Sequence, residues 1–218
     1  MIGVIIAMQC EADILLKEMN ISEQREICNK KIYVGSAYGK DIVLVLCGIG
    51  KVNAACGAQI AIDCYRADKL LNFGVAGGVS PETVVAEVYQ IEAAVEYDFD
   101  LAGLNHTKIG TLDECTDNYL PLSTLPLPIK SMKLATADRF NDNHSDYLLI
   151  KDYMQADIRD MEGGAVAQVA MHAKLPVYAW KAISDKAGSG SSFEQYNANK
   201  LRALENLHAH LPAFFALL

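Results

Sequence analysis

No run of basic residues, no close pair of cysteines and no long apolar stretch occurs in the sequence, and each absence excludes a class of protein. Lys and Arg number 19 against 27 Asp and Glu, which gives a net charge of −8. A phosphate backbone needs clustered basic side chains, so we expect no nucleic-acid partner. A membrane-spanning helix needs roughly 18 consecutive apolar residues, and we therefore expect no membrane partner either.

The cysteines and histidines are too scattered to suggest a metal centre. None of the six cysteines belongs to a CxxC pair, and the five histidines show no HxxxH spacing. Zinc sites need ligands at short, repeated spacings, so we expect no metal, no other cofactor and reduced thiols. The apolar start, Met1–Met8, lacks a basic leader and is typical of a first strand rather than a signal peptide. We therefore expect a cytoplasmic protein.

Strand-like and helix-like segments alternate along the chain, which is typical of an α/β protein. Hydrophobic residues make up 51% of the 218 positions, and no linker or internal repeat divides them, so we predict one α/β domain over residues 1–218. A glycine-rich block, Gly74–Gly78, should end a strand, and residues 103–128 should form a long loop. We predict strands at 2–8, 31–38, 41–47, 69–73, 88–95, 132–137, 157–161 and 177–185, and helices at 11–19, 52–65, 163–174 and 194–208.

Asp185 is the leading candidate for a catalytic residue. It ends the apolar run Val177–Asp185, just before a stretch rich in Gly and Ser that cannot continue a buried strand. In open α/β sheets ligands bind beyond the carboxyl ends of the strands. A carboxyl group partly withdrawn from water can keep its proton to neutral pH and donate it. Asp185 is thus a candidate general acid, although an N-cap or a turn would also use an acid here.

Two further acids and two glycine turns follow other expected strands. Glu11 and Glu162 stand at helix starts, where each could simply complement the helix dipole. The Gly48–Gly50 turn lacks the third glycine of a dinucleotide fingerprint and could only pack helix on sheet. Three carboxylates without metal-binding histidines favour proton transfer and hydroxyl recognition. A serine triad is disfavoured because no G-x-S-x-G elbow occurs.

Five segments, in this order and spacing, resemble the 5′-methylthioadenosine/S-adenosylhomocysteine nucleosidases of the nucleoside phosphorylase superfamily. The resemblance implies a single-domain, three-layer α/β/α fold with a central mixed, largely parallel sheet. It also implies a homodimer whose substrates are a small nucleoside and water. The segments are Ile2–Glu11, Cys47–Ala55, Asn72–Gly78, Asp160–Glu162 and Ala182–Asp185.

The resemblance also implies a role for each matching position. Asp185 protonates N7 of the adenine, with support from Ser184; Glu162 accepts a ribose hydroxyl, and Glu11 activates the attacking water. Met161 lies under the sugar. The remaining positions surround the substrate: Phe140 and the backbone at Asn141 against the purine, Met8, Ile49 and Phe193 around the 5′-substituent, Val75 and Gly77 in the glycine block, Lys181 before the last motif, and Leu101 and Leu104 closing the pocket of a neighbouring subunit.

Three positions depart from the family pattern. Val75 stands where the family has serine, which removes a hydroxyl near the site. Lys181 replaces an arginine, keeping the charge but losing the bidentate fork. Arg139 stands beside Phe140 where a small residue is usual, so its charge meets either a polar substrate group or solvent.

The predicted function is hydrolysis of the N-glycosidic bond of such adenine nucleosides, with release of adenine and a ribose derivative. A phosphorylase is a first alternative, disfavoured because Asn72 and Phe73 stand where phosphorylases have an arginine, and because Glu11 would repel phosphate. A second is a hydrolase of another, futalosine-like nucleoside, whose carboxylate Arg139 could pair. A non-catalytic nucleoside-binding protein is the least favoured, since a binder needs no proton donor.

Overall fold

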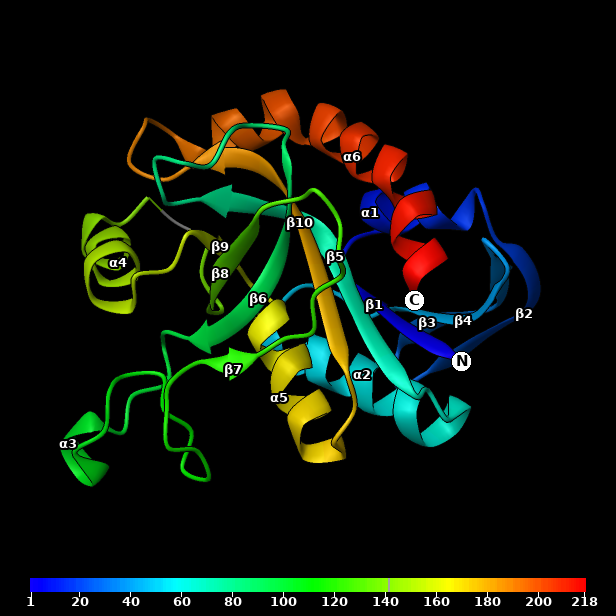
Figure 1. Cartoon of the computed structure of the whole chain (residues 1–218), viewed down its shortest axis with the longest axis horizontal. Helices are drawn as coiled ribbons and strands as arrows, with labels where there is room; N and C mark the ends of the chain where they lie inside the picture. Colours follow the sequence, from blue (N-terminus) through cyan, green and yellow to red (C-terminus); the bar gives the residue numbers. More distant parts are fainter. Residues whose placement is uncertain (141) are drawn as a thin grey trace.

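The structure is a computed structural model that describes residues 1–140 and 142–218 (Figure 1). Asn141, expected at the purine edge, lies outside the described residues. The strands are β1 (Ile2–Ile6), β2 (Asn20–Ile27), β3 (Lys30–Ala37), β4 (Lys40–Leu46), β5 (Lys69–Gly78), β6 (Val88–Glu96), β7 (Leu120–Pro121), β8 (Ser131–Thr136), β9 (Ile158–Asp160) and β10 (Val177–Lys186). The helices are α1 (Gln9–Leu16), α2 (Lys51–Tyr65), α3 (Ala102–Asn105), α4 (His144–Leu148) with a π-helical continuation over Leu149–Met154, α5 (Gly163–Ala173) and α6 (Ser192–Leu217).

The strands form one mixed sheet, part of which closes on itself. β10 pairs with both β5 and β6, and β6 leads through β8 and β9 back to β5, so these five strands form a ring. From β5 the sheet continues outward through β1, β4, β3 and β2. The mixed sheet is confirmed, but only half of the described strand pairings are parallel, so the sheet is less parallel than expected.

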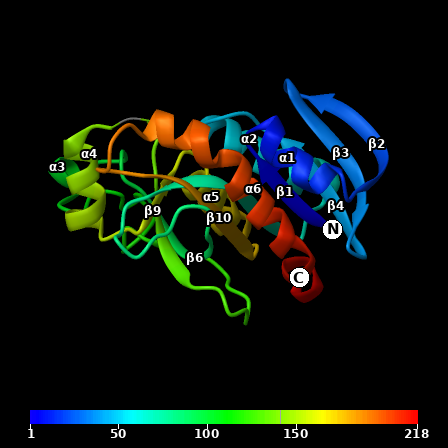
Figure 2. The same cartoon turned by 90° about the horizontal axis from the view of Figure 1, so that it is seen from above.

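The two larger apolar cores of the described residues lie on opposite faces of the sheet, because side chains alternate along each strand. In β1, Ile5 packs in the core that α2 and α5 cover, whereas Val4 and Ile6 pack in the core of α1 and α6. Figure 2 shows α6 running beside α1 over the second core. Within the described residues, no helix combines the length and the apolar composition that crossing a membrane requires.

Several expected elements need correction. β5 runs through Gly74–Gly78 instead of ending there, and α6 extends to Leu217 rather than His208. The sequence did not indicate β2, because this strand is mostly exposed and polar, nor the helical segment from His144 to Met154. The expected strands at 31–38 and 41–47 form the β3–β4 hairpin, whose turn residues Tyr38 and Gly39 both have positive φ as in a type I′ turn.

Candidate active site

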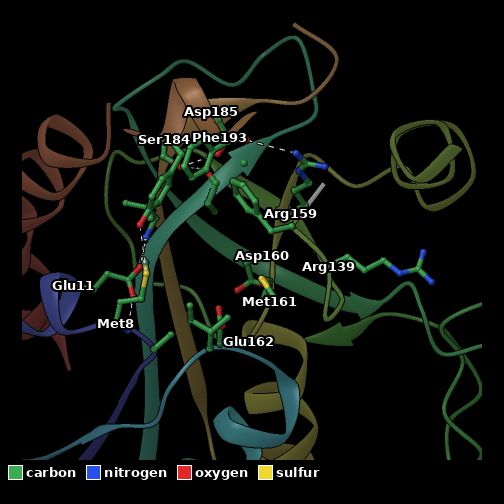
Figure 3. Close-up of a pocket in the computed structure, with 17 residues that line it drawn as sticks. Met8, Glu11, Arg139, Arg159, Asp160, Met161, Glu162, Ser184, Asp185 and Phe193 are labelled. Atoms are coloured by element: carbon green, nitrogen blue, oxygen red, sulfur yellow. Dashed lines mark hydrogen bonds and ion pairs between the residues drawn. The ribbon is translucent and has the colours of Figure 1, made fainter. Parts of the chain in front are cut away.

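A cavity of about 400 Å³ lies where β1, β5 and β10 end, beside β9 and the start of α6 (Figure 3). The cavity is bounded by the segment after β1, the last residues of β5 and β10, and the β9–α5 junction. All three candidate acids, Glu11, Glu162 and Asp185, line it. Segments far apart in the sequence thus bring together the three acids that were expected beyond the carboxyl ends of the strands.

Asp185 points into the cavity because β10 contains a bulge. Ile183 pairs with Ala76, and Asp185 pairs with the next residue of β5, Gly77. Ser184 is therefore an extra, unpaired residue in β10. Ser184 Oγ donates a 2.8 Å hydrogen bond to Asp185 Oδ1. Asp185 Oδ2 is fully buried and accepts no hydrogen bond from the described residues. One carboxyl oxygen is therefore held in place, while the other, which lies 3.6 Å from Arg159 Nη2, accepts no hydrogen bond from the described residues.

Glu11 is fixed by backbone donors at the start of α1. Its Oε1 accepts from the Val75 amide at 2.8 Å and its Oε2 from the Met8 amide at 3.1 Å. Gly74 makes room for it, since a Cβ there would lie 2.3 Å from Glu11 Oε1. Burial raises the pKa of Glu11, and the charge of Lys181 offsets part of that effect. The carboxylate is therefore a stronger base than an exposed glutamate.

Glu162 occupies the N-cap position of α5 and accepts a 2.9 Å hydrogen bond from the Gly50 amide. Gly50 has φ of 101°, a conformation that glycine adopts without strain. The pKa of Glu162 is raised to about 7, mainly by burial and then by the nearby charge of Asp160, while Lys181 acts in the opposite direction. Glu162 can therefore exchange a proton near neutral pH.

Lys181 lies behind the cavity wall rather than in it. Its Nζ contacts Asp160 Oδ2 at 2.8 Å, and Asp160 also accepts from Thr136 Oγ1 at 2.6 Å and from the Gly163 amide at 2.8 Å. Burial acts to lower the pKa of Lys181, but the carboxylates of Asp160, Glu162 and Glu11 outweigh it and raise that pKa. The lysine is therefore a buried cation that offsets the charge of the acids.

The rest of the cavity wall is largely apolar. Met8, Ile49, Val75, Phe140, Met161 and Phe193 all line it, as expected, and so does Gly77. Tyr196 of α6 was not anticipated; its ring meets that of Phe140 edge to face, with 6.0 Å between centroids. Its position three residues after Phe193, on the same face of a helix, was the signal that could have revealed it.

Some charged and apolar residues lie at or outside the edge of the cavity, and one important residue was missed. Leu101 and Leu104, expected to close the pocket of a neighbouring subunit, do not line the cavity of their own chain, and Leu104, in α3, is 75% exposed. Arg139 lines the rim, but its guanidinium points away from the acids and contacts Asp146 at 3.0 Å (Figure 3). Arg159 was overlooked although it lines the cavity 3.6 Å from Asp185. Its place in the same short strand as Asp160, directly before the Asp160–Glu162 motif, was the available signal.

The described residues include no group of three or more His, Cys, Asp or Glu arranged to hold a metal ion. Besides Asp160, whose carboxylate pairs with Lys181, the cavity offers three carboxyl groups in different surroundings. One has an oxygen that accepts no hydrogen bond from the described residues, one is held by two amides, and one accepts from the Gly50 amide. Such a set can donate a proton, accept a proton and hold hydroxyl groups.

Comparisons with known proteins agree with this architecture. The family model described as Phosphorylase superfamily matches residues 1–216, so the chain belongs to that superfamily. A 5′-methylthioadenosine/S-adenosylhomocysteine nucleosidase of Marinomonas sp. (strain MWYL1) is 30% identical over 89% of this chain and 90% of its own length. At this similarity the chain belongs, within the superfamily, to the 5′-methylthioadenosine/S-adenosylhomocysteine nucleosidase family.

Two further proteins extend the comparison. The aminodeoxyfutalosine nucleosidase of Campylobacter jejuni is 28% identical over 88% of this chain and 89% of its own length. The solved structure of the Streptococcus pneumoniae MTA/SAH nucleosidase with 8-aminoadenine has a TM-score of 0.90 at 24% identity, covering 100% of this chain and 99% of that one. The latter likeness establishes the shared fold.

Proposed function

We propose that this protein hydrolyses the N-glycosidic bond of adenine nucleosides of the 5′-methylthioadenosine and S-adenosylhomocysteine type. The observation that carries the proposal is the placement of Asp185, Glu11 and Glu162 around one largely apolar cavity. The similarity to nucleosidases with those substrates supports it. A small apolar 5′-group suits the wall formed by Met8 and Ile49, because apolar surface is favourably removed from water there.

In the proposed mechanism Asp185 acts as the leaving-group acid. Its Oδ2, which accepts no hydrogen bond from the described residues, carries the proton that N7 of the purine takes as the C1′–N9 bond breaks and its electron pair moves onto the base. The Ser184 hydroxyl keeps Oδ1 in place and helps to stabilise the carboxylate that forms. Phe140 stacks on the purine, and its 50% exposure leaves a ring face available for this contact.

Glu11 acts as the general base on the water. The hydroxyl adds to C1′, and the second proton of the water goes to Glu11, whose burial strengthens it as a base. Glu162 accepts hydrogen bonds from the ribose hydroxyls and stabilises the positive charge that develops on the sugar. The products are the free base and the ribose derivative, and proton exchange with solvent restores both acids.

Hydrolysis suits the cavity better than phosphorolysis. The cations that line it are Arg139, which contacts Asp146, and Arg159, which lies beside Asp185. The charged side chains that line the cavity around Glu11 and Glu162 are carboxylates, which repel a phosphate, and Lys181 behind the wall is already paired with Asp160. The test is release of adenine from 5′-methylthioadenosine with and without phosphate. We expect equal rates, whereas a strict phosphate requirement would overturn the hydrolase assignment.

A nucleoside with a carboxylated 5′-group is a second candidate, because a relative is an aminodeoxyfutalosine nucleosidase and Arg139 lies at the rim. That substrate would have to draw Arg139 away from Asp146. Wild-type and Arg139→Met protein should be compared on 5′-methylthioadenosine and aminodeoxyfutalosine. Turnover of the carboxylated nucleoside alone, lost in the variant, would favour the second candidate.

A homodimer forms part of the proposal. Leu101 and Leu104 stand outside the cavity of their own chain, and the exposure of Leu104 leaves it available to a second copy. Light scattering should give twice the chain mass. Leu104→Asp should shift the protein toward monomer and weaken substrate binding if the neighbouring subunit closes the pocket.

A further inference from the structure

Arg159 and Asp185 converge from two strands over the same glycine. Gly77 in β5 pairs with Arg159 of β9 on one side and with Asp185 of β10 on the other. A Cβ at Gly77 would lie 3.0 Å from both Arg159 Nε and Asp185 Oδ2. The missing side chain of Gly77 therefore lets the two charged groups meet at the cavity wall, with 3.6 Å between Arg159 Nη2 and Asp185 Oδ2.

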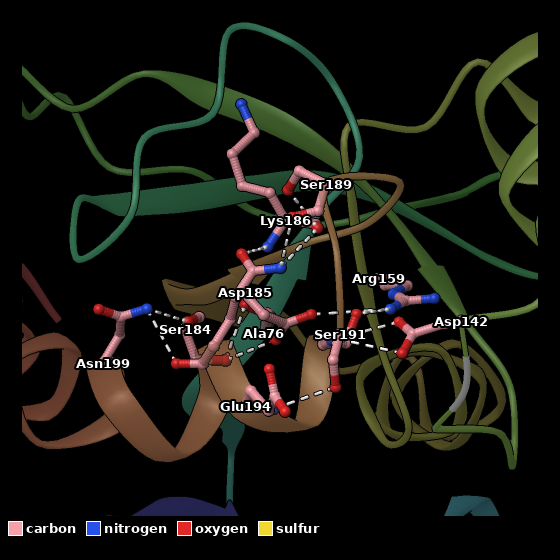
Figure 4. A network of polar contacts seen from close by, with 12 residues as sticks. Ala76, Asp142, Arg159, Ser184, Asp185, Lys186, Ser189, Ser191, Glu194 and Asn199 are labelled. Atoms are coloured by element: carbon pink, nitrogen blue, oxygen red, sulfur yellow. Dashed lines mark hydrogen bonds and ion pairs between the residues drawn. The ribbon is translucent and has the colours of Figure 1, made fainter.

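The guanidinium is held in this position by the start of α6. Arg159 Nη2 donates a 2.9 Å hydrogen bond to Ser192 Oγ, and the Ser192 amide donates to both carboxylate oxygens of Asp142 at 3.1 Å. Figure 4 shows Arg159 between Asp185 and Asp142. The Arg159 side chain is 9% exposed. A buried cation is unfavourable unless polar groups compensate it, and here several polar contacts hold the guanidinium at the cavity.

Purines differ at the edge formed by N7 and the substituent at position 6, which is the edge that Arg159 and Asp185 would contact. In a 6-aminopurine N7 accepts a hydrogen bond and the amino group donates, whereas in a 6-oxopurine N7 and O6 both accept. A guanidinium only donates, with five N–H groups, and a carboxylic acid donates one proton. Arg159 and protonated Asp185 together therefore present two donors, which matches the 6-oxo edge.

We propose that Arg159 is a specificity-determining residue that admits 6-oxopurines as leaving bases, by donating to O6 while Asp185 protonates N7. The inference rests on the proposed nucleosidase function. The bond changes are those given above: C1′–N9 breaks, N7 takes the proton of Asp185, and the hydroxyl of water joins C1′ as its proton passes to Glu11. Arg159 transfers no proton; its charge stabilises the electron density that collects on O6.

The test compares two nucleosides that differ only at position 6, 5′-methylthioadenosine and 5′-methylthioinosine, in phosphate-free buffer. The wild-type protein should cleave the 6-oxo compound with kcat/KM within about tenfold of the 6-amino compound. In Arg159→Met the ratio of the two values should move about 100-fold against the 6-oxo compound, as expected when a donor to a buried acceptor is lost. Arg159→Lys should recover part of that loss, because one donor is restored.

Arg202→Met is the matched control, since Arg202 is an exposed arginine of α6 and should leave the ratio unchanged. Thermal unfolding of each variant shows whether it is folded. The proposal is overturned if the wild type discriminates more than about 1,000-fold against the 6-oxo compound, or if Arg159→Met lowers both values equally. If neither nucleoside is cleaved, the proposed function fails, and calorimetry with hypoxanthine and adenine decides on Arg159: selective weakening of hypoxanthine supports its role, and equal weakening contradicts it.

Discussion

Lys181 and Asp160 form a 2.8 Å ion pair in which both side chains are only 2% exposed. Asp160 also accepts from Thr136 in β8 and from the first amide of α5. The pair therefore joins β8, β9, β10 and α5 at the cavity, which Asp160 lines and Lys181 supports from behind. Taking two charges out of water is costly, so the pair depends on both members being present.

Lys181→Met should destabilise the protein by about 3–5 kcal/mol, because it leaves Asp160 buried without its cation. Urea unfolding measures the loss. The double variant Lys181→Met with Asp160→Asn should recover part of it, since both charges are then absent. A single variant within about 1 kcal/mol of the wild type would show that the pair contributes little.

Asp185→Asn should lower kcat for 5′-methylthioadenosine by at least about 100-fold, because an amide cannot deliver the proton to N7. Binding of a non-hydrolysable analogue, measured by calorimetry, should change only a few-fold, as the shape of the side chain is kept. Asp63→Asn, an exposed acid on α2, is the control for loss of a charge. Near-normal turnover in Asp185→Asn would remove this residue from the mechanism.

Glu162 should make folding stability fall as pH rises. Its folded pKa, about 7, exceeds the ordinary value of 4.5 because of burial and then Asp160. The folded state therefore binds this proton more tightly than the unfolded state, and the stabilisation is complete below 4.5 and lost as pH rises through about 7. The change amounts to at most about 3 kcal/mol.

Urea unfolding of wild type and Glu162→Gln across this pH window checks the prediction. The variant should show a flatter dependence, because its amide does not titrate. Glu205→Gln, which alters an exposed acid on α6, should follow the wild type. Parallel curves for wild type and Glu162→Gln would mean that other groups dominate the titration.

Gly77→Ala should impair catalysis more than stability. The added methyl would lie 3.0 Å from both Arg159 Nε and Asp185 Oδ2, so these two groups would have to move by a few tenths of an ångström or more. Misplaced catalytic groups cost up to about 100-fold in rate, and we expect a 10- to 100-fold fall in kcat/KM. Gly103→Ala is the control, because no atom lies within 4 Å of its added Cβ. Equal kinetics for the two variants would contradict the close fit at Gly77.

The sequence predicted the α/β class and the three acids because both depend on local pattern. An apolar run followed by Asp185, or by a turn and Glu11, places an acid at a strand end without any knowledge of the neighbours. The outer strand β2 has no buried face, so its residues carry no alternating pattern to detect. β5 continues through glycines because Glu11 and Thr83 occupy the space that side chains at Gly74 and Gly78 would need.

Other parts of the site depend on which strands become neighbours. Arg159 lies beside Asp185 only because β9 and β10 pair on either side of β5. The position of Lys181 behind the wall follows from the same ring of strands, and nothing in the local sequence distinguishes a lysine in the wall from one behind it. Long-range pairing of this kind is not encoded in a single segment, which is why Arg159 and the pairing of Lys181 with Asp160 were found only in the structure.

The bulge at Ser184 decides to which face of the sheet the Asp185 side chain points. Side chains alternate along a strand, so without a bulge Asp185 would lie on the same face as Lys181 and Ile183. Their side chains point toward α5 and the core that α2 and α5 cover. The extra residue of the bulge shifts the alternation by one, so the Asp185 side chain points to the opposite face of the sheet. One further inserted residue between Ser184 and Asp185 would send the acid back toward the apolar core while leaving every motif readable in the sequence. The position of the catalytic acid thus depends on the number of residues in β10 as well as on which residues they are.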